Sequence, residues 1–354
     1  IFYMLRAPLA EWLLDDKSLA DQVGWLSVGV VLLVVAGSQR ALLTGLRRIG
    51  DIAKMTILAS VVSTVAGLVS LYVLGDSGII LFVLSVPLAT LLVSTFYVGN
   101  QGRVKFRFVQ LKAFMKHGSV LIRLGAGFMV AGAAILLGQL AVRAIIQNEL
   151  GETSLGYFQA AWSISMTYIG FVLAAMGTDY FPRLTEVIKD HSAARELVNH
   201  QTEVALLLAG PVLIAMLAFT PWVIQVLYTN EFMPASSILR WQILGDVLKV
   251  LSWPLGFVIV ASGKAKVFMF TESFAITVFV AASWLLLPYL QVEATGVAFL
   301  LMYVCYLPLV LFFARRLLRF EYLSSIKKEA AALIFVAIVV AMLGWYSVIW
   351  LSLI

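Results

Sequence analysis

Charged residues are scarce in this sequence. They make up 12% of its 354 residues, whereas 62% are hydrophobic and the mean hydropathy is +0.99. A soluble domain of ordinary composition carries roughly 25% charged residues. Because so little charge would leave large apolar patches in water, the composition excludes a cytosolic enzyme, a nucleic-acid-binding protein and a disordered chain.

Cysteine and histidine are also rare. The single cysteine, Cys305, lies within an apolar run, which excludes a disulfide framework and a thiolate metal site. The three histidines are scattered, and the sequence contains neither an HExxH zinc motif nor a GxxxxGK[ST] phosphate loop. We therefore expect no metal site, no cofactor and no ATP-driven pump in this chain.

Long apolar runs, in contrast, are abundant. A helix needs roughly 20 mainly apolar residues to span a bilayer. The sequence contains ten such runs, at about 22–39, 53–74, 78–98, 119–147, 155–179, 203–228, 238–261, 267–290, 293–314 and 330–353. These runs are too long for barrel strands and lack their polar alternation, so the sequence predicts an all-α, polytopic membrane protein.

The basic residues alternate between the two sides of this predicted bundle. Nineteen of the 25 Lys and Arg residues lie in every second connecting segment, at 40–54, 99–118, 180–203, 262–267 and 315–329. The charged residues of the segments between them are one lysine, Lys17, and eight acidic residues. Cytoplasmic loops of membrane proteins carry such an excess of basic residues. The surplus of positive charge therefore indicates orientation rather than a binding surface. The longest cytoplasmic loop is expected around 180–203, with a short surface helix within it as an alternative.

A weak internal repeat relates the two halves of the chain. Turns around Gly45 and Gly263 resemble each other at a separation of 218 residues, and Gly78 and Gly296 show the same separation. Both turns are expected on the cytoplasmic side with six helices per repeat, which predicts two parallel bundles. The expected parts are a partial amino-terminal bundle at 1–98, a basic linker at 99–118, a six-helix bundle at 119–318 and an extra helix at 319–354. The repeat also implies that further helices of the first bundle precede Ile1.

Parallel bundles without an ATPase motif suggest a secondary transporter, with a duplicated scaffold that transports nothing as the alternative. Asp179 and Glu272 are candidates for coupling to H⁺ or Na⁺. Both are expected near the cytoplasmic ends of their helices, where a simple interfacial position would also explain them.

Polar residues at membrane depth are costly and usually face a cavity. On the run 238–261, Gln242, Asp246 and Lys249 are spaced i, i+4 and i+7 and so share one face. Asp246 and Lys249 can form an ion pair. Such a pair fits a structural bridge to a neighbouring helix and a cavity wall equally well.

Two further groups of polar residues are candidates for substrate binding. Gln139, Arg143 and Gln147 share a face, and the guanidinium of Arg143 would suit a phosphate, although it would also reach the membrane interface. Gln159 and Trp162, among other aromatic and hydroxyl side chains on the run 155–179, would suit sugar rings. Ordinary helix packing is the alternative for that run.

Two segments of the sequence resemble a known family. Phe232–Val250 (FMPASSILRWQILGDVLKV) and Leu155–Val187, together with the Gly45–Arg47 turn, are similar to bacterial O-antigen and lipid III flippases of the Wzx type. These flippases form the polysaccharide transporter family of the multidrug/oligosaccharidyl-lipid/polysaccharide (MOP) exporter superfamily. The resemblance extends to about Arg319.

This resemblance implies two six-helix bundles that alternate between inward-open and outward-open forms around a cationic cavity. The cargo would be an undecaprenyl-diphosphate-linked oligosaccharide, moved across the bacterial inner membrane. Arg143 lies where similar proteins carry a basic residue, and Asp246 and Lys249 lie in the shared motif. The expected partners are this lipid-linked glycan, membrane lipids and polysaccharide polymerase machinery, and no nucleic acid.

Two other functions stay open on the sequence. A drug or small-cation exporter of the same superfamily would carry acidic residues, rather than arginine, deep in its cavity. A membrane-embedded polysaccharide polymerase or ligase is disfavoured by the short external loops.

Overall fold

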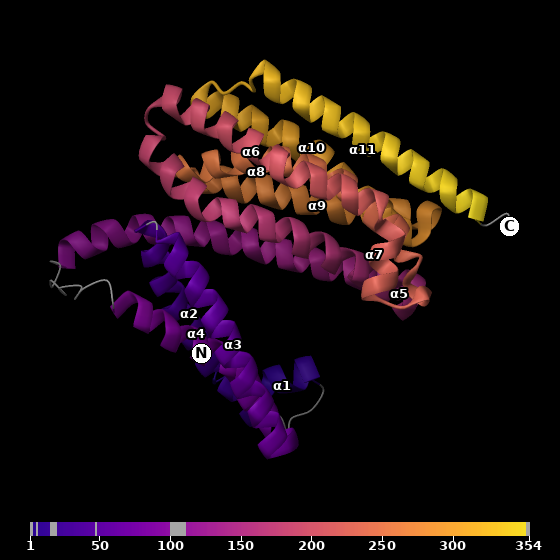
Figure 1. The fold of residues 1–354 in the computed structure, drawn as a ribbon. Coiled ribbons are helices and arrows are strands. Elements are labelled where there is room, and N and C mark those ends of the chain that lie inside the picture. Colours follow the sequence, from indigo (N-terminus) through magenta and orange to yellow (C-terminus); the bar gives the residue numbers. More distant parts are fainter. Residues whose placement is uncertain (1–2, 5, 15–19, 47, 100–110, 352–354) are drawn as a thin grey trace. The chain divides into compact units, whose positions relative to one another are not determined.

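The chain folds as a set of long helices (Figure 1). The structure, a computed structural model, describes residues 3–4, 6–14, 20–46, 48–99 and 111–351, and no strand occurs among them. The all-α prediction is thereby confirmed. The chain divides into two compact units, residues 1–108 and 109–354. Much of the predicted basic linker, at 100–110, and the predicted loop around Lys17, at 15–19, lie outside the described residues.

The first unit is built from helices that bury little of their surface. Its described α-helices are α1 (Arg6–Leu14), α2 (Ala20–Gly45), α3 (Ile49–Leu74) and α4 (Ile79–Gly99). The Ser85 hydroxyl of α4 donates a hydrogen bond of 3.0 Å to the Ser63 carbonyl of α3, and small side chains at such a seam let membrane helices approach closely. Only 17% of the apolar window of α2 or α3 is buried, so most of it is available to lipid.

The second unit is a larger bundle. Its α-helices are α5 (Leu111–Val187), α6 (His191–Ala218), α7 (Thr220–Leu227), α8 (Ala235–Ala261), α9 (Ala265–Leu290), α10 (Ala294–Leu318) and α11 (Ser324–Leu351). The long α5 is two helices joined at Gly151, whose backbone angles of φ 81° and ψ 178° are non-helical. Residues with a side chain avoid positive φ, so glycine suits this break.

The helices account for the predicted membrane spans. Seven stretches of described residues are long and apolar enough to cross a bilayer. Two of them, Gly125–Val187 and Ala265–Leu318, are 63 and 54 residues long. The first contains the predicted run 155–179 and most of 119–147, and the second contains 267–290 and 293–314. The first is divided at Gly151 and the second at the 3-10 turn Gln291–Glu293. The last predicted run, 330–353, lies on α11 as far as Leu351, and α11 is not among these seven stretches.

The predicted loop at 180–203 is wrong. Helix α5 continues to Val187 and α6 already begins at His191, which leaves a turn of three residues. The Asp190 carboxylate caps α6 by accepting hydrogen bonds from the backbone N–H groups of Ser192 and Ala193. Charged residues lower the hydropathy of these helix ends but do not end the helices, because capping and backbone hydrogen bonds decide where a helix starts and stops.

The predicted run at 203–228 is also not one helix. It is interrupted at Phe219, between α6 and α7, and Pro221 lies in the first turn of α7. Proline is tolerated there because the first N–H groups of a helix have no partner within the helix.

Helix α8 is the most enclosed of the membrane-length helices. Of its apolar window, 61% is buried. Two glycines bring α10 onto it: a Cβ at Gly296 would lie 2.7 Å from the Ile238 carbonyl oxygen, and one at Gly245 would lie 2.6 Å from the Phe299 ring. The polar residues of α8 therefore lie inside protein rather than in lipid.

Candidate functional site

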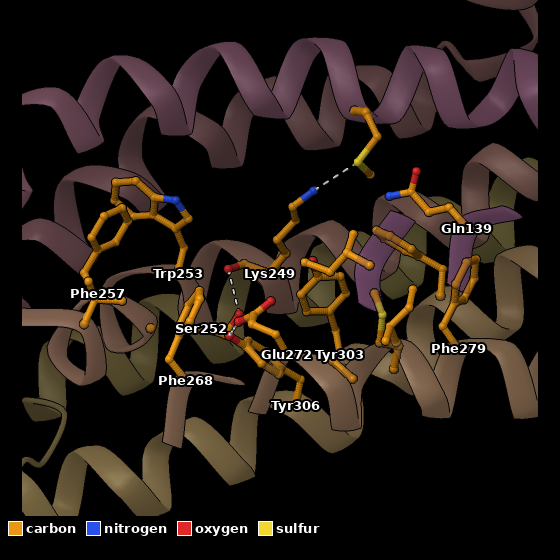
Figure 2. A pocket seen from close by; sticks show the side chains of 18 of the residues that line it. Gln139, Lys249, Ser252, Trp253, Phe257, Phe268, Glu272, Phe279, Tyr303 and Tyr306 are labelled. Atoms are coloured by element: carbon orange, nitrogen blue, oxygen red, sulfur yellow. Dashed lines mark hydrogen bonds between the residues drawn. The ribbon is translucent and has the colours of Figure 1, made fainter. Parts of the chain in front are cut away.

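A cavity of about 590 Å³ lies inside the second unit, between α5, α8, α9 and α10. Ten of its 21 lining residues are aromatic, and its acidic and basic lining side chains are Glu272 and Lys249. Figure 2 shows both residues in this wall together with Gln139, Tyr303 and Tyr306. A concave, mostly apolar site with a few polar groups is the usual form of a ligand pocket.

Lys249 enters the cavity from α8. Its ammonium lies 3.6 Å from a carboxylate oxygen of Asp246 and 3.5 Å from the Met166 sulfur. It also lies 5.8 Å from the ring centroid of Phe299 and 5.9 Å from that of Tyr303. In Figure 2 the ammonium is directed toward the Met166 sulfur on α5 rather than toward Glu272. Aromatic faces at this range attract a cation.

Asp246 lies behind the cavity wall and is fully buried. One of its carboxylate oxygens accepts hydrogen bonds from Ser165, at 2.7 Å, and from Tyr168, at 2.9 Å, both on the second half of α5. The other oxygen faces Lys249. Burying a charge is costly unless it is paired and hydrogen-bonded, so these contacts hold the carboxylate as the counter-ion of Lys249.

Gln242 lies one helical turn before Asp246 on the same face of α8. It is fully buried, and neither atom of its amide group has a hydrogen-bond partner within the described part of the chain. It does not line the cavity.

Glu272 enters the cavity wall from α9. Its carboxylate accepts a hydrogen bond of 2.5 Å from the Tyr306 hydroxyl of α10, drawn as a dashed line in Figure 2. Among the described residues it has no cationic partner. The sequence suggests an interfacial position, whereas the structure places Glu272 in the cavity wall, two turns into its helix.

Arg143 lies outside the lining of the cavity. Its Nε donates a hydrogen bond of 3.1 Å to the Gln159 amide oxygen, which joins the two halves of α5 on either side of Gly151. Gln147, one turn beyond Arg143, is exposed, and Gln139, one turn before it, lines the cavity. The predicted polar face of this helix thus divides between the cavity and a separate cluster of Arg143 and Gln159.

Asp179 is removed from both groups. It forms an ion pair of 3.1 Å with Arg183 on its own helix.

Several lining residues were missed by the sequence analysis. The sequence pattern points to Trp162 but not to Phe279, whose ring stacks on it with centroids 5.6 Å apart at an interplanar angle of 25°. Tyr303 and Tyr306, three residues apart on α10, were also missed. Their spacing places two hydroxyl groups on one helix face, and this was the available signal.

No metal centre is evident. Among the residues that the structure describes, no group of three or more His, Cys, Asp or Glu side chains could hold a metal ion.

Comparison with known proteins identifies similar chains. A family described as "Polysaccharide biosynthesis protein" matches residues 1–237. The lipid III flippases of Escherichia coli K12 and Shigella flexneri are each 20% identical over 314 residues, which is 87% of this chain and 74% of theirs.

Solved structures share the fold. One is a MATE in the bent conformation, with a TM-score of 0.76 and 16% identity, covering 93% of this chain and 76% of its own. Another is a MOP superfamily transporter from Pyrococcus furiosus, with a TM-score of 0.78 and 14% identity, covering 90% and 74%. The binding pocket of that transporter is described as having reverse polarity.

Proposed function

The chain belongs to the polysaccharide biosynthesis protein family, and from that premise we propose that it is a flippase for lipid-linked oligosaccharides in the bacterial inner membrane. It is a multi-pass membrane protein, and similar proteins are named as lipid III flippases and as a transporter of the MOP superfamily. The proposed cargo is an undecaprenyl-diphosphate-linked repeat unit, moved from the cytoplasmic to the periplasmic leaflet by alternating access. The observation that carries the proposal is a cavity inside a membrane bundle with Lys249 in an aromatic wall.

The proposed roles follow from the surroundings of each side chain. Arg143 binds the diphosphate, because its guanidinium is partly exposed and its described hydrogen bond is to a neutral amide. Gln159 belongs to this cluster. Gln139 and Gln147, one turn to either side of Arg143 on the same helix, are further candidates for substrate contact, and Gln139 lines the cavity. Trp162 offers a ring for sugar stacking.

The α8 residues and the two remaining acids take other roles in this proposal. Lys249 supplies the basic side chain of the cavity wall and Asp246 holds it in place, while Gln242, on the same face of α8, is a further candidate for substrate contact. Glu272 is the candidate for H⁺ or Na⁺ coupling that lines the cavity, with Asp179 as the second candidate. Membrane lipids and the polymerase that consumes the glycan are the proposed partners.

The test is transport in vesicles. Purified protein is reconstituted with a fluorescent undecaprenyl-diphosphate oligosaccharide, and its transfer between leaflets is followed by quenching. We expect Arg143→Ala to lower the rate on the order of tenfold or more, as for loss of a hydrogen bond to a charged group. Lys266→Ala, at an exposed position in the first turn of α9, is the matched control and should leave the rate unchanged. Absence of transfer by the unaltered protein would contradict the flippase activity. Normal transfer by Arg143→Ala would contradict only the role of Arg143.

Export of hydrophobic cations is the second candidate function. The observation that favours it is Glu272, an acidic side chain without a described cationic partner in an aromatic cavity. MATE structures with the same fold are compatible with it. Transport of a cationic dye, but not of the lipid-linked oligosaccharide, by the same vesicles would favour this candidate.

A further inference from the structure

The cavity has the composition of a cation site. Aromatic faces attract cations through their quadrupoles, most strongly where water is excluded. Four rings that line the inner part of the cavity, those of Trp162, Phe279, Phe299 and Tyr303, form an unbroken series with centroids 5.1 to 6.2 Å apart. Glu272 adds a carboxylate to the same lining. An external hydrophobic cation would be attracted to such a wall.

A cation belonging to the chain already occupies this place. The Lys249 ammonium is within cation–π distance of both Phe299 and Tyr303. Its side chain is 17% exposed, so it takes up space within the wall rather than extending into solvent. Asp246 restrains it from behind, and Ser165 and Tyr168 restrain Asp246 in turn.

We propose that Lys249 is a tethered cation that occupies the cation-attracting corner of the cavity and thereby excludes hydrophobic cations from it. A second positive charge near the same rings would meet both like-charge repulsion and filled space. Specificity often depends on such an element directed against the wrong ligand. This role goes beyond the proposed flippase activity and does not depend on it, since it concerns binding of a probe rather than transport.

The test is binding of tetraphenylphosphonium to the purified protein in detergent. The unaltered protein should bind it weakly. Lys249→Met keeps an unbranched side chain but lacks the terminal ammonium, and we expect its affinity to rise on the order of 30-fold, the contribution of a desolvated cation–π contact. Lys266→Met removes a lysine charge outside the cavity and should leave the affinity unchanged.

Two double variants make the test specific. Adding Glu272→Gln to Lys249→Met should lower the gained affinity at least tenfold, because the carboxylate that attracts the cation is then neutral. Adding Asp246→Asn to Lys249→Met removes the buried charge left without its partner. This double variant should keep the raised affinity for the probe, and it provides a folded protein if the Lys249→Met single variant unfolds.

Any one of three results would contradict the proposal. The first is that the unaltered protein binds tetraphenylphosphonium as tightly as the variants do. The second is that Lys249→Met and its Asp246→Asn double variant, both shown to be folded by their melting curves, bind the probe no more tightly than the unaltered protein. The third is that the gained affinity survives Glu272→Gln, which would place the probe outside this cavity.

Discussion

Lys249 and Arg143 are cations of the same helical unit, but their surroundings differ. Lys249 is largely buried, lies beside an acid and touches aromatic rings and a thioether. Arg143 is partly exposed, and its described hydrogen bond is to the neutral amide of Gln159. The charge of Lys249 is therefore compensated and fixed in place. The charge of Arg143 is left available to an anion.

This difference separates two uses of positive charge within a membrane bundle. A buried ammonium must keep its counter-ion, because an unpaired charge in a low-dielectric interior is costly. A partly exposed guanidinium is hydrated and needs no such partner. We therefore expect changes around Lys249 to affect stability and selectivity, and changes around Arg143 to affect transport with little effect on stability.

The largest expected effect is that of Asp246→Ala. Removing the acid leaves the Lys249 ammonium buried without a counter-ion, and we expect the free energy of unfolding to fall by about 3 kcal/mol. Equilibrium unfolding in mixed detergent micelles, followed by tryptophan fluorescence, measures the change. The double variant Lys249→Met/Asp246→Asn should recover most of the loss. Equal loss in the single and double variants would show that Asp246 acts otherwise than as a counter-ion.

An intermediate effect is expected from Tyr168→Phe. The substitution removes one of the two hydroxyl hydrogen bonds to the Asp246 carboxylate, and hydrogen bonds to charged groups contribute about 1.5 kcal/mol or more. The same unfolding measurement should show a loss of about that size. Tyr157→Phe is the control, because Tyr157, also on α5, packs its ring on Phe232 of the 3-10 turn Asn230–Phe232. A loss no larger than that of the control would remove Tyr168 from the support of the ion pair.

The smallest expected effect is that of Gln159→Leu. The hydrogen bond to Arg143 is exposed, so its loss should lower the free energy of unfolding by only about 0.5 kcal/mol. Melting curves of the variant and the unaltered protein check this. A loss as large as that of Asp246→Ala would erase the contrast between the two cations.

The membrane helices were predictable because a bilayer imposes a strong local requirement. A run of apolar residues long enough to span it must form its backbone hydrogen bonds within the helix. The ends were less predictable, as the continuous backbone around 180–203 shows. Asp190 and its two N–H partners decide where α6 begins, and one aspartate among several charged residues is a weak signal in sequence.

The candidate site was predictable only along single helices. Spacing correctly placed Gln242, Asp246 and Lys249 on one face of α8, and it allowed the ion pair that the structure contains. It did not indicate Tyr303 or Tyr306, which come from a helix some 50 residues later. Helical spacing also did not show that Gln139 lines the cavity whereas Arg143 does not.

The sequence alone determined that this is a polytopic helical membrane protein, which loops carry the basic residues, and which polar side chains share a helix face. These properties depend on hydropathy, charge and a period of 3.6 residues, all of which are local. Only the tertiary structure decided that Lys249 and Glu272 line one cavity, that Asp246 lies behind its wall and that Arg143 belongs to a separate cluster. Which faces meet depends on how helices distant in sequence pack together, and the close approach of α10 to α8 at Gly245 and Gly296 sets that packing.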